Sequence, residues 1–491
     1  MLNKPEIHRP RGGDPVANGD DAITANANAL STLWDRALKV ATYSEFPSGP
    51  VTSWYGTAAE GIYRAPSQQV VDGLAGVPQG AGPGLVTVVA VGSTTSQITW
   101  EEFGDLGRSW RMTASSSSAY ASGWQLIPGS KRVATSLTLG RANDVRTATE
   151  VAHALPLTLG ARAHRWRLHV RNTNDRTTNT VQGVLSYAPV RIGKMQRTAA
   201  GEATAAVVPG TLQTVAPAST SPETGNELAT PWVEDFPLEP GTDYVIRYGF
   251  TAGEGQEINY LEGGGWSLDA GVSALSSASP AATLSARAPL DVWIELEVDA
   301  STPCFAYFGD SLTAGQEATL PVYDSWPARH ARAHGAIPTF FAHAGARMSE
   351  WTNPAHIKFR KYQLPGYSIT RADRLYWSMG SNDLFAEDKS VEDMLAAMAV
   401  TFPLITAVTS RNVIMTTVLP RHDAEDPQEP VRREWNEYIQ RNLPHGTLMV
   451  LDAAAALTAP DGDQLDTTWS STPTNIHLSS AGYARFAAQV H

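Results

Sequence analysis

The sequence predicts a multidomain protein that begins with β-rich domains and ends with an α/β domain built on a parallel sheet. Residues 43–128 are a β-type region punctuated by Gly and Trp, and within residues 131–300 short stretches alternate apolar and polar side chains, which is the pattern of strands with one solvent-exposed face. From Pro303 onward, apolar runs of strand length alternate with segments of helical periodicity, as in a sheet covered by helices on both faces. A chain of 491 residues has room for about three domains.

Residues 1–42 are expected to form an extended arm followed by a short helix. The arm is polar and rich in proline, and in residues 21–40 apolar side chains recur in alternating steps of four and three. This coiled-coil spacing is too short to be stable alone. The pattern therefore fits two structures equally well. One is a helix packed on its own domain, and the other is an oligomerisation helix, for which we expect a homotrimer. The apolar positions are Ile23, Ala27, Leu30, Trp34 and Ala37.

Residues 43–130 are expected to form a small β domain. An apolar, β-branched run at 85–91 and short strands at 97–100 and 109–111 are separated by turns. The sequences Trp54-Tyr55-Gly56, Gly61-Ile62-Tyr63-Arg64 and Gly123-Trp124-Gln125-Leu126 resemble the small knob domains of phage tail fibres and pyocins. The resemblance implies a virion tail protein that contacts other tail proteins through its N-terminal region.

Residues 131–300 are expected to form a β-sandwich of the jelly-roll or carbohydrate-binding kind. Apolar side chains alternate with polar ones along residues 166–170, 244–250 and 292–298, and loops rich in Ser, Thr, Pro and Gly lie between these stretches. The pattern is equally compatible with a spacer and with a glycan-binding module.

Residues 301–491 are expected to form the α/β domain. The expected strands are 304–308, 339–342, 374–378, 413–418 and 448–451. The expected helices are 322–333, 391–408, 431–442 and 479–490, with Pro403 a candidate kink in the second of them.

Four short motifs fall at expected strand ends or helix starts of this domain. Gly309-Asp310-Ser311-Leu312 follows the first buried strand, where a serine is placed either for chemistry or as a helix N-cap. Gly345, Gly380-Ser381-Asn382-Asp383 and His477-Leu478-Ser479-Ser480-Ala481-Gly482-Tyr483 follow it in order. Together they resemble the conserved blocks of the GDSL, or SGNH, hydrolases over about residues 301–491.

This resemblance implies a three-layer, flavodoxin-like fold and a serine esterase that needs no cofactor. Ser311 would be the nucleophile and His477 the general base. The backbone N–H groups of Ser311 and Gly345 and the side chain of Asn382 would form the oxyanion hole. The alternative is that Gly345 only makes a turn and that Asn382 only caps a helix.

One position departs from the family pattern. Three residues before the His, where the family usually has an Asp that orients the imidazole, this chain has Thr474. The carboxylate could instead come from Asp466, Asp463 or Asp452. Otherwise the enzyme could run as a Ser–His dyad, with a carbonyl or Thr474 holding the ring, or the site could be weakened or inactive.

Composition excludes several other classes of function. A net charge of −12 argues against nucleic acid and against an anionic membrane surface as partners. A single cysteine, Cys304, excludes an intrachain disulfide and is expected in the core. No metal-ligand motif occurs. No apolar run approaches the length of a membrane span, and Met1 to Pro5 do not resemble a signal peptide.

The sequence thus predicts an esterase on a virion tail, made in the host cytosol and active at the host cell surface. Its expected substrates are ester substituents, such as O-acetyl groups or lipid esters, of surface glycans. A tail protein that binds glycans through a non-catalytic hydrolase fold is the alternative suggested by Thr474. A third hypothesis is an ordinary cytosolic lipase or thioesterase, but the long β-rich region before residue 301 argues against it.

Overall fold

The computed structural model describes residues 40–41, 61–65, 84–92, 95–102, 109–115, 120–121, 125–126, 131–136, 142–172, 184–220, 228–353, 372–410, 412–421, 426–460, 464–472 and 476–490. The chain forms two compact units, Met1–Arg132 and Val133–His491. The expected arm and helix of residues 1–39 lie outside the described residues.

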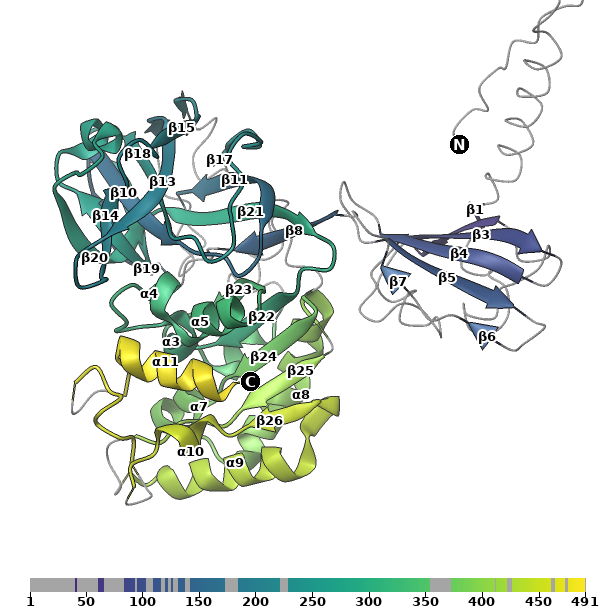
Figure 1. Ribbon diagram of the computed structural model, residues 1–491. Helices are drawn as coiled ribbons and strands as arrows, with labels where there is room; N and C mark the ends of the chain where they lie inside the picture. Colours follow the sequence, from purple (N-terminus) through teal and green to yellow (C-terminus); the bar gives the residue numbers. More distant parts are fainter. Residues whose placement is uncertain are drawn as a thin grey trace, which may run out of the picture. The chain divides into compact units, whose positions relative to one another are not determined.

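The first unit contains one seven-stranded sheet, shown at the purple end of the ribbon in Figure 1. Its strands form an antiparallel meander from β2 onward, while β1 pairs with β2 in parallel. Val86, Val88, Ile98, Trp100 and Met112 are buried along one face, because successive side chains of a strand point to opposite faces. The strands are β1 (Val40–Ala41), β2 (Gly61–Ala65), β3 (Gly84–Gly92), β4 (Thr95–Glu102), β5 (Ser109–Ser115), β6 (Tyr120–Ala121) and β7 (Gln125–Leu126).

The second unit begins with two sheets packed around a common apolar core. The larger sheet has the order β14-β13-β18-β10-β19-β20, with β9, β12, β15 and β16 attached, and the smaller has the order β17-β11-β21-β8. The strands are β8 (Lys131–Ser136), β9 (Ala142–Thr147), β10 (Glu150–Leu157), β11 (Ala163–Arg171), β12 (Ser186–Tyr187), β13 (Val190–Arg197), β14 (Ala203–Val207), β15 (Gln213–Ala216), β16 (Ser219–Thr220), β17 (Leu228–Ala229), β18 (Tyr244–Thr251), β19 (Glu257–Leu268), β20 (Ala282–Pro289) and β21 (Asp291–Asp299), with the 3-10 helix η4 (Gly271–Ser276).

A five-stranded parallel sheet of order β23-β22-β24-β25-β26 follows. Its strands are β22 (Cys304–Gly309), β23 (Ile337–Ala342), β24 (Arg374–Ser378), β25 (Val413–Thr416) and β26 (Met449–Leu451). Its helices are α3 (Ser311–Ala314), α4 (Pro321–Asp324), α5 (Trp326–Ala333), η5 (Met348–Trp351), α7 (Ser381–Glu387), α8 (Val391–Val408), α9 (Glu429–Asn442), η7 (Pro444–Gly446), α10 (Ala453–Leu457) and α11 (Ser480–Gln489).

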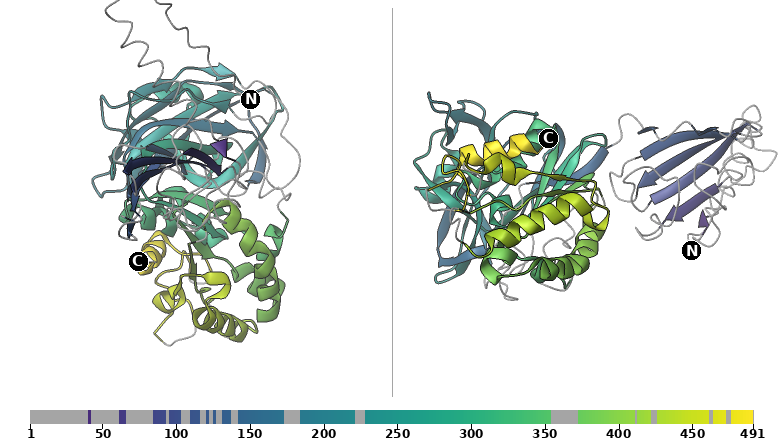
Figure 2. Two further views of the ribbon diagram at one scale, coloured as in Figure 1. Left: turned by 90° about the vertical axis from the view of Figure 1, so that its right-hand side faces the viewer. Right: turned by 90° about the horizontal axis from the view of Figure 1, so that it is seen from below.

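Helices cover both faces of this sheet, so the C-terminal domain has three layers (Figures 1 and 2). On one face Phe308 and Trp377 pack with residues of α8 and α9, including Met398 and Trp435. On the other face the alternate strand residues pack with α5, α10 and α11. The expected helix 322–333 is broken at Ser325, which separates α4 from α5 because its backbone is extended (ψ 156°). Pro403 lies inside α8, which remains one helix.

Side chains of the sandwich and of the α/β domain pack together in the same apolar clusters. Strands β18 and β21 were expected to have one wet face, but nearly all of their residues are buried. The reason for β21 is that Trp293 joins the core cluster of the α/β domain, while Glu295 and Asp291 on the same strand face are buried in ion pairs. Cys304 is buried in the core, as expected.

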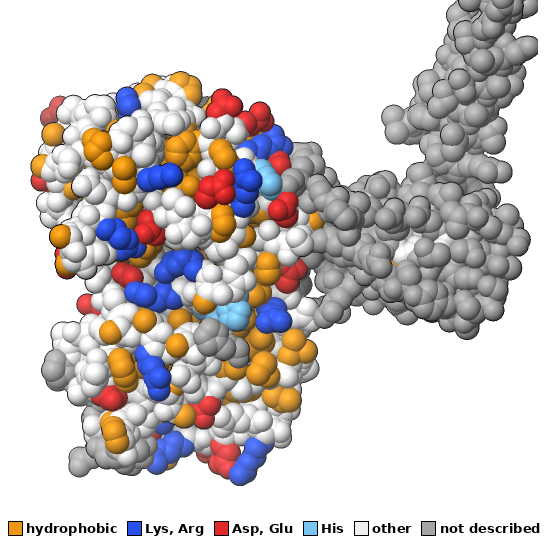
Figure 3. All heavy atoms as spheres, in the orientation of Figure 1, with side chains coloured by type: hydrophobic (Ala, Val, Ile, Leu, Met, Phe, Trp, Pro, Cys, Tyr) orange, Lys and Arg blue, Asp and Glu red, His pale blue; other side chains and the backbone are white. Residues whose placement is uncertain are grey.

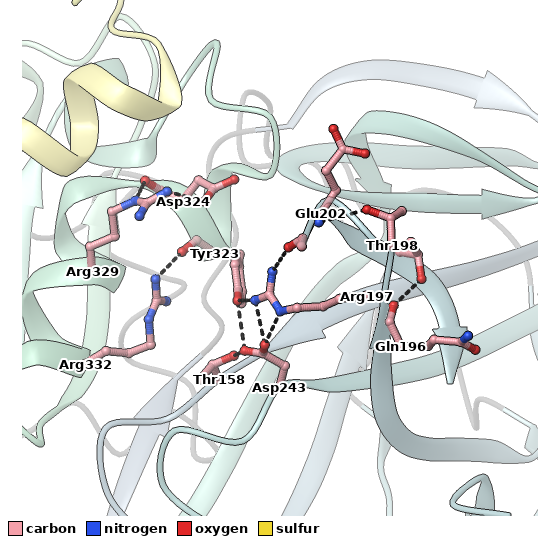
Figure 4. Close-up of polar contacts among 12 residues, drawn as sticks. Thr158, Gln196, Arg197, Thr198, Glu202, Asp243, Tyr323, Asp324, Arg329 and Arg332 are labelled. Atoms are coloured by element: carbon pink, nitrogen blue, oxygen red, sulfur yellow. Dashed lines mark hydrogen bonds and ion pairs between the residues drawn. The ribbon is translucent and has the colours of Figure 1, made fainter. Parts of the chain in front are cut away.

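Polar contacts also join the two domains, close to α4 (Figure 4). The Tyr323 hydroxyl donates to Asp243 Oδ1 over 2.8 Å, and the Arg197 guanidinium donates both to Asp243 and to the Tyr323 oxygen. Glycines permit close backbone approach, since a Cβ on Gly264 would lie 2.5 Å from Pro321 Cδ. The segment that follows the Ser311 helix is therefore held by the sandwich.

Candidate active site

Ser311 is the first residue of α3 and lies two residues after the end of β22. The turn between them is tight, because a Cβ on Gly309 would lie 2.0 Å from Thr313 Oγ1 and 2.8 Å from the Ser378 carbonyl oxygen. Asp310 is the N-cap of α3, and its carboxylate accepts a hydrogen bond of 3.0 Å from the Leu312 N–H. The turn thereby presents Ser311 at the carboxyl edge of the sheet, with 6% of its surface exposed.

His477 reaches this edge from the other end of the domain. The segment before α11 is held by a bridge between Ser470 and Leu478 and by a hydrogen bond from Ser471 N–H to the His477 carbonyl. Its ring Nε2 lies 2.9 Å from Ser311 Oγ, although 166 positions separate the two residues. This is the geometry that a nucleophile and its general base require.

The His477 imidazole is held in its neutral form. Burial, together with the positive charge of Arg421, lowers its pKa from 6.5 to about 4. A neutral imidazole is able to take the proton of the Ser311 hydroxyl, whereas an imidazolium is not. The environment therefore favours the base function of His477 at neutral pH.

Gly345 and Asn382 follow the two strands that neighbour β22. Gly345 lies in the turn after β23 with φ +71°, and a Cβ there would meet open space. Asn382 is the second residue of α7, after β24, and its side-chain amide donates to the Ala346 carbonyl over 3.1 Å. The ends of three adjacent strands thus bring Ser311, Gly345 and Asn382 to one edge of the sheet.

The buried carboxylates of Asp310 and Asp383 accept backbone hydrogen bonds from neighbouring turns. The Asp383 carboxylate accepts from the Met348 N–H over 3.0 Å, which joins α7 to the segment after β23. Burial raises the pKa of Asp383 to about 6 and that of Asp310 to about 7, and in Asp310 the nearby Asp383 adds to the shift. Their backbone partners give both carboxylates a structural role in the turns that follow β22 and β24.

The orienting residue of His477 was left open between several candidates. Asp466 Oδ1 accepts from the Thr468 N–H, and Asp452 Oδ1 accepts from Thr417 and from the Ala455 N–H. Within the described part of the chain, neither carboxylate contacts His477. Thr474 and Asp463 lie outside the described residues.

His343, which directly follows β23, is separate from the Ser311–His477 pair. His343 is fully buried, and its ring packs against Trp351 with centroids 5.4 Å apart. His422 lies outside the described residues. Among the described residues, no group of His, Cys, Asp and Glu is arranged to hold a metal ion.

Sequence reasoning missed Arg421, which lies just beyond β25. Its guanidinium packs 4.1 Å above the ring of Phe385 on α7, and its charge acts on both His477 and Asp310. No family block contains it. The signal available in the sequence was its place shortly after the expected strand 413–418, at the same sheet edge as Ser311.

Comparison with known proteins identifies the class of this domain. Residues 307–485 match the model of the GDSL-like Lipase/Acylhydrolase family. The chain therefore carries a GDSL-type hydrolase domain and is, by class, a carboxylic ester hydrolase. No curated protein matches the sequence.

Solved structures similar to this chain include esterases of the same class. A family two carbohydrate esterase from Cellvibrio japonicus is 9% identical and has a TM-score of 0.32, with 74% of this chain and 96% of that one covered. A family two carbohydrate esterase from Clostridium thermocellum, solved with cellohexaose, is 12% identical with a TM-score of 0.33, covering 73% and 97%. A member of the lipolytic protein G-D-S-L family from Veillonella parvula is 14% identical with a TM-score of 0.29, covering 38% and 96%.

Proposed function

We propose that the chain is a serine esterase in which Ser311 and His477 carry the reaction. The observation that supports this most directly is the 2.9 Å separation of Ser311 Oγ and His477 Nε2 inside a GDSL-type domain. The neutral His477 ring accepts the Ser311 proton as Oγ attacks the ester carbonyl. The same ring then returns that proton to the leaving alcohol, which leaves an acyl-enzyme for water to hydrolyse.

The negative charge that develops on the carbonyl oxygen needs donors at the same sheet edge. The N–H groups of Ser311 and Gly345 and the Asn382 amide are proposed for this role. Asn382 uses one donor on the Ala346 carbonyl, and a carboxamide nitrogen carries two N–H groups. The positive φ of Gly345 and the open space beside it would let a substrate approach its backbone closely.

The proposed substrates are ester substituents, such as O-acetyl groups or lipid esters, of glycans on a host cell surface, and the proposed setting is a virion tail. This setting is supported by the resemblance of residues 43–128 to tail-fibre knob domains and by the meander of strands found there. Figure 3 shows acidic and basic side chains interspersed over one face of the described region. Within that region no helix is long and apolar enough to cross a membrane.

Hydrolysis of a short-chain para-nitrophenyl ester tests the proposal, using wild type, Ser311→Ala and His477→Ala. Each variant should lose at least about a thousandfold in kcat/KM, because nucleophile and base act as one unit. Ser276→Ala, an exposed serine of the sandwich, is the matched control and should keep the wild-type rate. Equal rates for wild type and Ser311→Ala would contradict the proposal and favour a glycan-binding protein without turnover.

A further inference from the structure

Arg421 is a cation placed beside a group that must itself become positively charged. In acyl transfer His477 passes through an imidazolium, and a neighbouring guanidinium makes that state less favourable. An arginine with this effect on the general base is costly unless its charge is neutralised during turnover. Among the residues that the structure describes, no carboxylate forms an ion pair with Arg421.

The contacts of Arg421 position its guanidinium without pairing it. The Leu465 N–H donates to the Arg421 carbonyl over 3.0 Å, and the guanidinium packs on Phe385. Its Nε is buried and has no hydrogen-bond partner, and no ion pair to its guanidinium occurs among the residues that the structure describes. Arg421 is thus fixed at its backbone carbonyl and at the flat face of its guanidinium, and no residue in the described part of the chain accepts a hydrogen bond from that guanidinium.

Two described carboxylates, Asp310 and Asp426, attract Arg421 without forming an ion pair with it. Asp310 attracts the guanidinium, but burial raises the pKa of Asp310 to about 7, so that it is only partly ionised at neutral pH. Asp426 also attracts it, but Asp426 Oδ1 accepts from the Gln428 N–H.

On the elements packed against Arg421, the other carboxylates have partners of their own. On α7, Asp383 accepts from the Met348 N–H, and Glu387 pairs with Arg347 over 2.8 Å. Next to Leu465, the Asp466 carboxylate accepts from the Thr468 N–H. None of these side chains takes up the donor edge of Arg421 in the described structure.

We propose that Arg421 binds a carboxylate of the substrate, so that the enzyme selects anionic esters over neutral ones; this rests on the proposed esterase function. The guanidinium of Arg421 stacks on the Phe385 ring through its flat face. Its N–H groups lie in one plane, in a forked arrangement that matches the two oxygens of a carboxylate. The bound carboxylate offsets the positive charge beside His477 and so makes the imidazolium of the transition state easier to form. Arg421 is a binding residue here, and Ser311 and His477 still make and break the bonds.

Matched pairs of esters that differ by one charge test this. On the alcohol side the pair is para-acetoxybenzoate and its methyl ester. On the acyl side the pair is para-nitrophenyl hemisuccinate and para-nitrophenyl methyl succinate. The pair that shows the preference identifies the side of the ester on which the carboxylate lies. Wild type should prefer the anionic member of one pair, and Arg421→Gln should lower this anionic-to-neutral ratio of kcat/KM roughly tenfold or more.

Two further variants separate charge from general damage. Arg421→Lys keeps the charge but not the fork, and should keep only part of the preference. Arg441→Gln removes an arginine whose partner is Glu437 on the exposed side of α9, and should keep the full ratio. An unchanged ratio in Arg421→Gln, or an equal fall in Arg441→Gln, would overturn the assignment.

The pH dependence gives a readout that a structural role would not change. For the anionic ester, the acidic limb of kcat should lie at higher pH than that of kcat/KM, because the bound carboxylate raises the pKa of His477 in the complex. For the neutral ester the two limbs should coincide. Coincident limbs for both esters would contradict the proposal.

The proposal can fail independently of the esterase function. Ser311-dependent hydrolysis of neutral esters with no Arg421-dependent preference overturns the role of Arg421 alone. Absence of any Ser311-dependent hydrolysis overturns both. Binding of the anionic member of the preferred pair to Ser311→Ala, measured by calorimetry, should be tighter than binding of its neutral partner and should lose that difference when Arg421→Gln is added.

Discussion

The Tyr483 hydroxyl donates a hydrogen bond of 2.7 Å to the Gln316 carbonyl, which joins helix α11 to the segment after the Ser311 helix. A second contact lies beside it, from the Thr319 N–H to Ser480 Oγ over 3.0 Å. His477 is two residues before the N-cap Ser479 of α11, and Gln316 is five residues after Ser311. The two contacts therefore hold the base-bearing segment against the nucleophile-bearing segment.

Tyr483→Phe should lower kcat by several-fold and the free energy of unfolding by about 1–2 kcal/mol. The change leaves the ring in its buried place but leaves the Gln316 carbonyl without this donor. Tyr438→Phe on α9, whose side chain is only partly buried, is the matched control. It should keep the wild-type kcat and should change the free energy of unfolding by no more than about 0.5 kcal/mol. Steady-state kinetics and chemical denaturation measure both effects. A variant as active and as stable as wild type would show that the contact does not hold the two segments together.

Gly482→Ala should destabilise the protein by about 1–3 kcal/mol or prevent folding. A Cβ on Gly482 would lie 2.2 Å from the Trp469 carbonyl oxygen, and the backbone there is held by Ser479 Oγ, which donates to the same carbonyl. Gly253→Ala is the control, because the nearest atom to its Cβ would be 3.8 Å away. Thermal unfolding of the two variants measures the difference. Similar melting temperatures for both would rule out a steric requirement at Gly482.

Much of the C-terminal fold could be predicted because its strands and helices carry their own periodicity. Helix α8 (Val391–Val408) and strand β24 (Arg374–Ser378) have the bounds that the apolar spacing indicates. The burial of both faces of β21 could not be predicted in the same way. The alternation of Trp293, Glu295 and Glu297 with apolar residues predicts a strand with one solvent-exposed face. Both faces are buried because the α/β domain packs against this strand.

The site could be predicted where each residue lies within a short motif. Ser311 and His477 meet as their motifs imply, and Gly345 and Asn382 follow neighbouring strands. Arg421 belongs to no motif, and its charge acts on His477 across a separation of more than 50 positions in the sequence. Sequence spacing carries no information about such a charge until the strand order is known.

The acidic limb of kcat/KM for a neutral ester should lie near pH 4. Burial and the charge of Arg421 lower the pKa of His477 to about 4, so the base stays neutral well below the ordinary histidine range. Activity should fall as pH drops through that value, because the protonated ring is unable to accept the Ser311 proton. In Arg421→Gln the limb should move to higher pH, since a cation beside the imidazole is removed. A limb near pH 6.5 in wild type would contradict this environment for His477.

Asp310→Asn should remove part of the pH dependence of stability. Burial raises the pKa of Asp310 from 3.8 to about 7, so the native state keeps a proton that the unfolded chain releases above about pH 4. Stability of wild type should therefore fall, relative to the variant, as pH rises from about 4 to 7. Asn keeps an oxygen that can accept from the Leu312 N–H.

Melting temperatures of wild type and Asp310→Asn across this pH range test the expectation. The exposed residue Asp269 provides the control, and Asp269→Asn should follow the wild-type curve at every pH. A constant difference between Asp310→Asn and wild type from pH 4 to 7 would show that Asp310 is ionised in the native state throughout.

The contact between Tyr323 and Asp243 should couple the sandwich to the Ser311 region (Figure 4). Burial raises the pKa of Asp243, but hydrogen bonds from Thr158, Arg197 and Tyr323 outweigh it and the pKa is lowered. The ionised carboxylate is thus the form that this interface stabilises. The stability it contributes is present above the ordinary Asp pKa and is lost as pH falls below it.

A double-mutant cycle of Tyr323→Phe and Asp243→Ala should give a coupling energy of about 1–2 kcal/mol at pH 7, because the contact is partly buried and one partner is charged. The exposed pair Arg162 and Glu239, 3.4 Å apart, is the control and should give about 0–1 kcal/mol. Both single variants should also lower kcat, since Tyr323 lies on α4 between the Ser311 helix and α5. Additive effects in the cycle, together with unchanged kcat, would mean that the sandwich packs beside the catalytic domain without positioning its nucleophile segment.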